Sequence, residues 1–188
     1  MPENVQEIIK RIKEGDQAAF RELVEAYRQS AFSLAFRIVC DEEEARDVVQ
    51  ESFIKIWIKI GTYDISQKFQ TWMYRIITNS AIDKVRQMKR RRLVSIEKVQ
   101  DRIENKDAGS FGNEDDNADI ARLIRHLADG LPEKQQLVFI LRDIEGVESD
   151  EVGKILDLSA DSVKSNLYHA RKTIREKLVR ANLYEGRQ

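Results

Sequence analysis

Apolar residues recur every three or four positions along most of this chain, which is the period of an α-helix. Residues 2–14 predict a short first helix, with Val5, Ile8 and Ile12 on one face and Gly15 as its stop. Asp16 can cap the next helix. That helix keeps the period through its apolar positions Phe20, Leu23, Val24, Tyr27, Ala31, Leu34, Ala35 and Ile38. This part of the chain is therefore predicted to be helical.

A third helix is predicted from Asp41 to Gly61, and it has two distinct faces. One face is apolar, with Ala45, Val48, Val49, Phe53, Ile56, Trp57 and Ile60. The other aligns polar groups with further isoleucines: Asp47, Gln50, Glu51, Ile54 and Ile58. Surplus apolar residues on a helix that already has a core face indicate a surface for a protein partner. The alternative is a helix buried on both sides.

A fourth helix is predicted from Phe69 into the basic run 89–92, with a core line at Met73, Ile77, Ala81 and Val85. Its other positions mix aromatic, amide and charged side chains: Gln70, Thr71, Trp72, Tyr74, Arg75, Asn79, Asp83 and Arg86. Bases stack on aromatic rings and phosphates attract cations, so this mixture favours binding of single-stranded DNA. Taken singly, the aromatic residues are more often core side chains.

The helical period is lost between residues 93 and 117 and then returns. The segment is rich in glycine and acidic residues, which predicts a flexible acidic linker. Such a linker usually only solvates, although it could mimic nucleic acid. Apolar positions resume at Ile120 and continue to Gly130, and Pro132 opens a helix that ends at Gly146. We therefore expect an all-α protein with two helical domains, 1–92 and 118–188, joined by the linker 93–117.

Residues 149–178 predict a helix-turn-helix, with Ser149 and Ser159 as candidate caps of its two helices. The second helix has an apolar stripe at Val163, Leu167, Ala170, Ile174 and Leu178. Its opposite face carries Lys164, Ser165, Tyr168, His169, Arg171, Lys172 and Arg175. Hydrogen-bonding groups suit base edges and cations suit phosphates, so this face is typical of a recognition helix in the major groove. A merely solvated basic face is the alternative.

Composition limits the functions that remain. The 188 residues carry a net charge of −1, so any affinity for nucleic acid must come from local segregation of charge. The single cysteine, Cys40, fits a reducing compartment. No signal core and no apolar run of the ~20 residues that a membrane span needs are present, so we expect a cytoplasmic protein without membrane insertion. Two histidines, one cysteine and no glycine-rich phosphate loop argue against a metal site, a cofactor and an enzymatic activity.

Three stretches of this sequence resemble bacterial RNA polymerase sigma factors of the extracytoplasmic-function (ECF) class. Residues 44–53 (EARDVVQESF) are similar to the family helix that docks on the polymerase clamp. Residues 69–83 (FQTWMYRIITNSAID) resemble the segment that melts and reads the minus-ten element. Residues 131–171, from LPEK to VKSNLYHAR, resemble the reader of the minus-thirty-five element. The three stretches occur in the family's order around a linker.

The resemblance implies site residues and partners. Core polymerase would be bound by Asp47, Gln50, Glu51 and Ile54. The minus-ten strand would be held by Gln67, Lys68, Trp72, Tyr74, Arg75, Asn79 and Arg86. The minus-thirty-five duplex would be contacted by Lys164, Ser165, Tyr168, His169, Arg171 and Lys172. The implied partners are core RNA polymerase, promoter DNA and an anti-sigma factor. Two departures from the family pattern are Gly153, where alanine is usual, and His169, where arginine is common.

Two other function classes stay open at the level of the sequence. A stand-alone helix-turn-helix regulator of duplex DNA would account for residues 149–178, but it leaves the segment around Trp72 and the acid-isoleucine face without a role. A helical interaction protein without any DNA contact would make the clustering of cations accidental.

Overall fold

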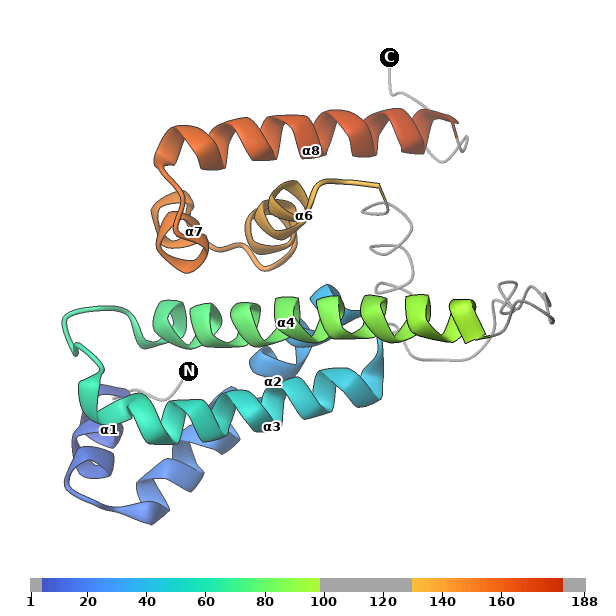
Figure 1. Cartoon of the computed structure of the whole chain (residues 1–188). Coiled ribbons are helices and arrows are strands. Elements are labelled where there is room, and N and C mark those ends of the chain that lie inside the picture. The colour runs from blue at the N-terminus through green and yellow to red at the C-terminus, as the bar shows by residue number, and fades with distance from the viewer. Residues whose placement is uncertain (1–4, 99–129, 181–188) are drawn as a thin grey trace.

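The computed structural model describes residues 5–98 and 130–180, and the elements within these ranges are all helices (Figure 1). The first range holds α1 (Val5–Lys13), α2 (Gln17–Val39), α3 (Glu42–Lys59), the 3₁₀-helix η1 (Ile60–Thr62) and α4 (Phe69–Lys98). The second range holds α6 (Glu133–Phe139), the π-helix η2 (Ile140–Ile144), α7 (Ser149–Leu156) and α8 (Ala160–Arg180). The predicted all-α fold class is confirmed.

Helix starts follow the predicted caps at all but one position. The Asp16 carboxylate accepts hydrogen bonds from the backbone N–H of Ala18 at 2.8 Å and of Ala19 at 3.1 Å. Asp41 caps α3 in the same way, and the Ser159 hydroxyl accepts from a backbone N–H of the first turn of α8. The prediction for Ser149 is wrong. The α7 helix starts one residue earlier than expected, so that the backbone carbonyl of Glu148 accepts the first helical bond.

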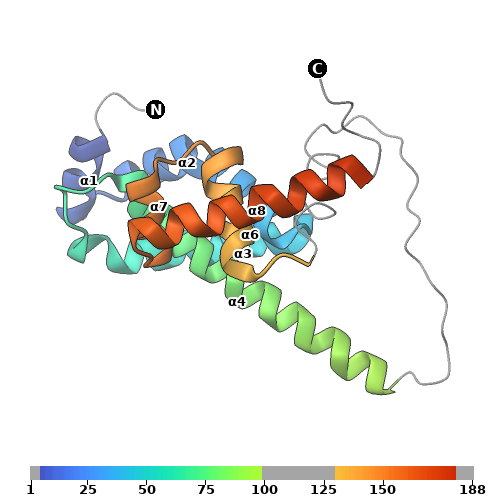
Figure 2. The same ribbon diagram turned by 90° about the horizontal axis from the view of Figure 1, so that it is seen from above.

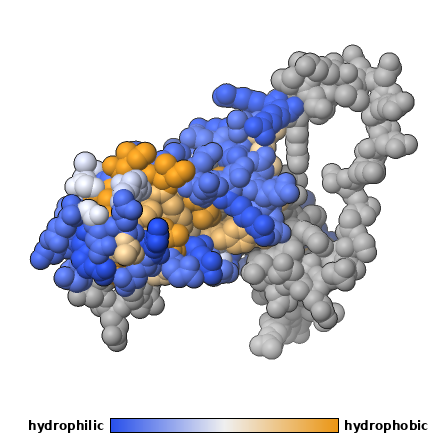
Figure 3. Space-filling view, turned by 90° about the horizontal axis from the view of Figure 1, so that it is seen from below, coloured by the Kyte–Doolittle hydropathy of each residue, from blue (hydrophilic) through white to orange (hydrophobic). Residues whose placement is uncertain are grey.

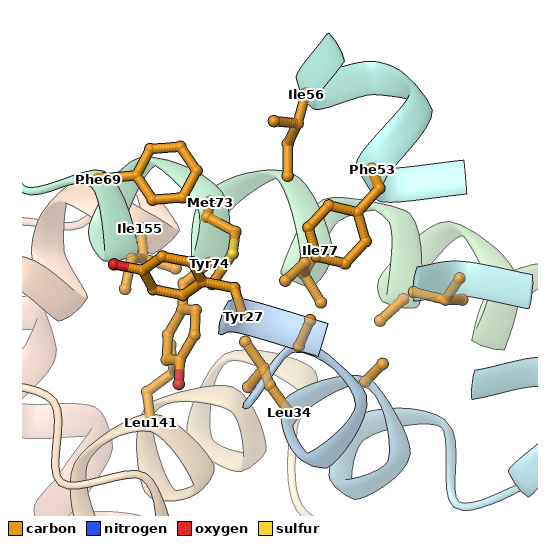
Figure 4. Packing of buried hydrophobic residues seen from close by; sticks show 14 of the residues in the cluster. Tyr27, Leu34, Phe53, Ile56, Phe69, Met73, Tyr74, Ile77, Leu141 and Ile155 are labelled. Atoms are coloured by element: carbon orange, nitrogen blue, oxygen red, sulfur yellow. The ribbon is translucent and has the colours of Figure 1, made fainter. Parts of the chain in front are cut away.

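The N-terminal half, α1 to α4, is built around α4, which packs on both α2 and α3. The core line expected along α4 is present, because Met73, Ile77 and Ala81 are fully buried. Side chains from α2 and α3, such as Leu34 and Ile56, meet this line from the two neighbouring helices (Figure 4). The apolar period of the sequence therefore placed this core correctly.

The C-terminal half, α6 to α8, packs against α4 through α7 (Figure 1). Seen from above, its helices cross over the first part of α4, and the rest of α4 extends beyond them (Figure 2). Leu141 and Ile155 of this half belong to the same apolar cluster as Tyr74 of α4. The two halves are far apart in the sequence, but they therefore contribute side chains to one buried apolar cluster.

The predicted linker and domain boundaries fall largely outside the described residues. Residues 99–117 of the linker and the apolar positions from Ile120 to Leu127 lie there, so the flexible character of the linker stays a prediction. The helix α4 continues to Lys98, past residue 92, at which the sequence pattern had placed the end of the first domain.

Candidate nucleic-acid and protein interfaces

A groove of about 1030 Å³ runs between α2 and α3 on the outer side of the N-terminal half. Its floor and walls are mostly apolar, and they include Phe20, Val24, Phe32, Val49, Phe53, Ile54 and Trp57. Figure 3 shows apolar side chains gathered on this face, flanked by hydrophilic ones. The rings of Phe20 and Trp57 meet edge to face with centroids 4.7 Å apart, which fixes one end of the groove.

The apolar residues on the outside of α3 are strongly exposed. Ile54 is 53% exposed, Trp57 40% and Ile58 72%. The alternative in which α3 is buried on both sides is therefore excluded. Arginines line the same groove at Arg21 and Arg28 of α2 and at Arg46 of α3, and Arg28 and Arg46 are paired with Glu25 and Glu42. The groove thus suits a partner that offers an apolar surface with a mixed polar rim.

The four predicted clamp residues share one exposed face of α3, because positions 47, 50, 51 and 54 are three or four residues apart. Gln50 and Ile54 line the groove. Asp47 instead lies 3.4 Å from the Lys84 ammonium of α4. Glu51 lines a separate polar cavity of about 470 Å³ between α3 and α4. The structure therefore brings the four side chains together on one exposed face, with 50 and 54 toward the groove and 47 and 51 toward α4.

The sequence pattern did not predict that residues of α2 form one wall of the groove. Phe20 and Val24 fit the helical period of the core, so the sequence pattern predicts them as core residues, and it gives no signal for Arg21 and Arg28. In the structure Phe20 and Val24 are only half-buried. The available signal was that α2 carries more apolar positions than a single buried stripe needs.

The predicted minus-ten residues are mostly on the exposed side of α4 and in the loop before it. Arg75, Asn79 and Arg86 are exposed along the helix, and Gln67 and Lys68 are exposed in the loop. Residues 75 and 79 lie one turn apart, so their side chains share a face. This part of the predicted site is a continuous polar surface.

An aromatic wall stands beside the loop at the start of α4. The ring of Trp72 lies 5.0 Å from that of Tyr63 and 5.8 Å from that of Phe69. The Tyr63 hydroxyl donates to the backbone carbonyl of Gln67, and the Ser66 backbone N–H donates to Asp64 at 2.9 Å. This backbone bond is the main reason that the pKa of Asp64 is lowered. The loop is therefore braced, and an unstacked base could lie between its polar backbone and the half-buried Trp72 ring.

Tyr74 does not lie on this exposed surface. It is only 2% exposed and points from α4 toward the C-terminal half, near Leu141 (Figure 4). Its hydroxyl donates to the Glu145 carboxylate at 3.4 Å. Burial, followed by the negative charge of Glu145, raises the pKa of the Tyr74 phenol. In this arrangement the side chain cannot reach a bound strand.

The helix-turn-helix presents the predicted recognition face. Val163, Ala170 and Ile174 are buried, whereas Lys164, Ser165, Tyr168, His169, Arg171 and Lys172 are all exposed. The Tyr168 and His169 rings meet edge to face at 5.3 Å. The structure therefore brings these six predicted side chains together along the exposed face of one helix.

Arg171 is held in place by a neighbouring carboxylate. Its guanidinium donates two hydrogen bonds to Asp143, at 2.8 Å from Nε and at 2.6 Å from Nη2. This bidentate pair raises the pKa of Arg171 and fixes the direction of the side chain. Asp143 of η2 is a positioning residue that the sequence pattern did not indicate, because it lies 28 positions from Arg171.

The structure explains why position 153 carries glycine where alanine is usual. A Cβ atom at this position would lie 2.8 Å from the backbone carbonyl oxygen of Leu158, in the turn between α7 and α8. The Gly153 carbonyl also accepts the Leu158 backbone N–H at 2.9 Å. The two helices approach each other closely here, and only glycine leaves room for the turn.

The described part of the chain has neither a candidate metal cluster nor a candidate membrane-spanning helix. Within residues 5–98 and 130–180, no group of three or more His, Cys, Asp or Glu side chains could hold a metal ion. None of the described helices is both long enough and apolar enough to cross a bilayer.

Two family models match the two halves of the chain. Residues 23–92 match Sigma-70 region 2, and residues 121–174 match Sigma-70, region 4. The sequence is 31% identical over 182 residues to the ECF RNA polymerase sigma factor SigW of Bacillus subtilis, a match covering 90% of this chain and 94% of that protein. It is 29% identical over 181 residues to the ECF RNA polymerase sigma-E factor of Escherichia coli K12, covering 92% and 93%.

Solved structures show the same fold. CnrH, in complex with the cytosolic domain of CnrY, superposes with a TM-score of 0.67 at 23% identity, covering 91% of this chain and 94% of that one. The sigma factor RpoE of Bartonella quintana, in complex with the anti-sigma factor NepR, gives a TM-score of 0.62 at 18% identity, covering 85% and 96%. The arrangement of helices is therefore shared with these proteins over most of the chain.

Proposed function

Since the chain belongs to the extracytoplasmic-function class of the sigma-70 family of RNA polymerase sigma factors, we propose that it docks on core polymerase through the α2–α3 groove when it directs initiation at promoters. The observation that carries this assignment is the exposed apolar surface at Ile54, Trp57 and Ile58. Exposed apolar residues gathered in one groove are typical of a surface that a protein partner covers.

The clamp of the largest polymerase subunit is the proposed partner of this groove. Its recognition would combine burial of Ile54 and Trp57 with pairing between acidic side chains of the clamp and the arginines of the groove, such as Arg21 and Arg46. Gln50 would contribute from the same wall. Asp47, which is paired with Lys84 of α4 at 3.4 Å, and Glu51 would contribute at the edge of this contact.

The two DNA surfaces would act at different elements of the promoter. The loop 64–68 and the exposed side of α4 would hold the melted non-template strand, with Trp72 as the stacking wall and Arg75, Asn79 and Arg86 along its path. The exposed face of α8 would read the minus-thirty-five duplex in the major groove. A stand-alone regulator of duplex DNA would leave the groove without a purpose.

We further propose that the chain contributes no catalytic group of its own and works in the cytoplasm, where the polymerase is. Control by an anti-sigma factor also stays a proposal for this protein.

Ile54→Glu tests the groove. A buried carboxylate without a partner opposes docking, so affinity for core polymerase should fall at least tenfold. The matched control is Ile65→Glu, which places the same group at a similarly exposed position in the loop, outside the groove. Affinity is measured by titrating labelled protein with core polymerase. If both variants bind as tightly as the unaltered protein, the groove is not the docking site.

A comparison of Gln50→Ala with Asp47→Ala locates the contact on α3. Gln50 lines the groove and Asp47 does not, so the first change should weaken binding of polymerase more than the second. The reverse order would place the clamp on the flank of α3 that faces α4.

A further inference from the structure

The loop before α4 is anchored at its first residue by α1, a helix to which neither the sequence pattern nor the family model gives a role. The Lys13 ammonium, at the end of α1, donates to the backbone carbonyl of Tyr63 at 2.7 Å, although the two residues are 50 positions apart. The α1 helix lies before residue 23, where the match to Sigma-70 region 2 begins. The contact therefore joins a helix without a known role to the loop of the proposed strand-binding surface.

From this contact we propose that Lys13 is a positioning residue for the melted strand, because it holds the loop 63–68 in the shape that receives an unstacked base. The inference rests on the proposed role of this loop and of α4. The ligand is single-stranded DNA with one base turned out of its stack. Lys13 acts on this strand through the loop and does not touch it.

Tyr63 connects the Lys13 contact to the side of the loop that faces the strand. Its side chain is buried, and its hydroxyl donates to the backbone carbonyl of Gln67 at the other end of the loop. Its ring lies 5.0 Å from that of Trp72, the proposed stacking wall. A shift of the Tyr63 backbone would therefore move both the far end of the loop and the ring against which Trp72 lies.

The turn that follows Tyr63 is also within reach of the Lys13 charge. The pKa of Asp64 is lowered, first by the hydrogen bond from the Ser66 backbone N–H at 2.9 Å and to a smaller extent by the positive charge of Lys13. The Gln67 backbone N–H donates to the Asp64 carbonyl at 3.1 Å. Two hydrogen bonds thus close the turn, and Lys13 lies where the turn begins.

The packing of α1 fixes the position from which Lys13 acts. Ile9 and Ile12 are buried, and α1 packs on α2 and on η1, beside the connection between α3 and α4 (Figure 1). At the turn into α2, the Arg11 guanidinium donates to the Asp16 carboxylate at 3.0 Å from Nε and at 2.7 Å from Nη2. Because these contacts tie α1 to the rest of the N-terminal half, Lys13 is a fixed anchor for the loop.

The contact affects DNA binding through the order of the loop. A base enters only when the loop has the receiving shape, so the apparent affinity is the affinity of that shape multiplied by its population. An ordered loop also loses less conformational entropy on binding. Without Lys13 the Tyr63 carbonyl loses a charged donor, and the population of the receiving shape falls. The loss is expected at the base that the loop holds, and not along the phosphates that cross α4.

The test uses the full chain assembled with core polymerase and a labelled pool of single-stranded DNA of random sequence. The variants are Lys13→Met, Lys13→Arg and the control Lys10→Met, which removes an equal charge from an exposed position of the same helix. Bound strands are sequenced, and affinity is measured by titration. We expect Lys13→Met to bind about fivefold more weakly and to lose its preference at one base position. Lys13→Arg keeps a charged donor and should restore that preference, and Lys10→Met should retain it.

Hydrogen exchange gives a second measurement that does not depend on DNA. The backbone amides of Ser66 and Gln67 should exchange faster in Lys13→Met than in Lys10→Met, whereas amides of the buried part of α4 should be unchanged. Faster exchange throughout the N-terminal half would mean a general loss of stability and would overturn the proposal. Equal base preference in Lys13→Met and Lys10→Met would overturn it as well, as would an equal loss of affinity for all sequences.

Arg75→Ala separates this inference from the proposed function. Arg75 is exposed on α4, along the proposed path of the strand, so its loss should weaken binding to every sequence. If the unaltered chain shows no base preference, or if Arg75→Ala binds the strand as tightly as the unaltered chain, the proposed strand-binding surface is wrong. If Arg75→Ala weakens binding and Lys13→Met behaves like Lys10→Met, only the positioning role of Lys13 is contradicted.

Discussion

The N-terminal half has two functional surfaces that differ in what covers them. The groove between α2 and α3 is apolar and exposed, and no described element of the chain lies over it. The α4 surface is polar, and carboxylates of the C-terminal half lie against part of it. The difference has a physical basis. Carboxylates meet α4 where polar side chains such as Arg86 and Tyr74 offer donors, whereas an apolar groove stays open until an apolar partner buries it.

This contrast allows the two proposed surfaces to be tested separately. The variants below change one surface and leave the other intact.

The largest effect is expected from Trp57→Ala, which removes a large exposed aromatic side chain from the groove. Tryptophan residues at interface centres contribute on the order of 2–4 kcal/mol to affinity, so binding of core polymerase should fall by a factor of about thirty or more. The affinity is measured by titrating the labelled protein with core polymerase. Val179→Ala, at an exposed apolar position of α8, should leave the affinity unchanged.

Gly153→Ala should disturb the position of α7 and leave the groove intact. Alanine normally favours a helix by about 1 kcal/mol over glycine, but here its Cβ would lie 2.8 Å from the Leu158 carbonyl oxygen. We expect a net loss of about 1–2 kcal/mol in the free energy of unfolding, measured with urea. Gly61→Ala is the control, because its Cβ would meet nothing within 4 Å. A gain in stability on Gly153→Ala would contradict the close approach between residue 153 and the Leu158 carbonyl oxygen.

Thr71→Val removes the donor to Glu151 while keeping the shape of the side chain. The Thr71 hydrogen bond is the main cause of the lowered pKa of Glu151, so its stabilising effect is present above the unfolded pKa of 4.5 and is lost as pH falls through the folded value. The variant should lose about 1 kcal/mol at neutral pH and less in acid. Thr78→Val is the matched control, since the hydroxyl of Thr78 is buried without a hydrogen-bond partner among the described residues. Equal losses at both positions would contradict the role of the bond.

Tyr74→Phe should have the smallest effect near neutral pH, about 0.5 kcal/mol, because the bond to Glu145 is long. The pKa of Tyr74 is raised above the ordinary 10.0, so its neutral form is favoured in the folded chain. The contribution of the neutral Tyr74 phenol to the stability of the fold is present below pH 10. It is lost as pH rises through the pKa of Tyr74 in the folded chain. X-ray scattering in alkaline solution should show the halves separating at higher pH in the variant. An identical alkaline transition would place the titrating group elsewhere.

Most of the helical pattern could be predicted because it depends on neighbours in the sequence. The caps at Asp16, Asp41 and Ser159 use hydrogen bonds that span two or three residues, and the buried stripe of α8 follows directly from the 3.6-residue period. The exposed recognition face of α8 follows from the same period, since it lies opposite the stripe. The assignment to the family rested on motifs of this local kind.

The site was predicted less completely where it depends on which helix lies alongside. The period of α3 shows that Gln50 and Glu51 are on its surface, but only the position of α2 and α4 decides that one lines the groove and the other faces a polar cavity. Tyr74 fits a strand-binding pattern, yet the approach of Glu145 from 71 positions away places it in a buried contact. The partners of Arg171 and Thr71 are similarly distant.

The sequence by itself determined the helices, their buried faces and the family, because each depends on the repeat of apolar residues and on short motifs. The tertiary structure decided which polar residues remain free. Arg75 and Asn79 are exposed on α4, whereas Lys68, Tyr74 and Arg86 lie against carboxylates of the C-terminal half, and Arg171 of α8 is paired with Asp143. The physical reason is that charge pairing acts through space. A carboxylate neutralises whichever cation the packing of α6 and α7 against α4 brings within a few ångströms, whatever their separation along the chain.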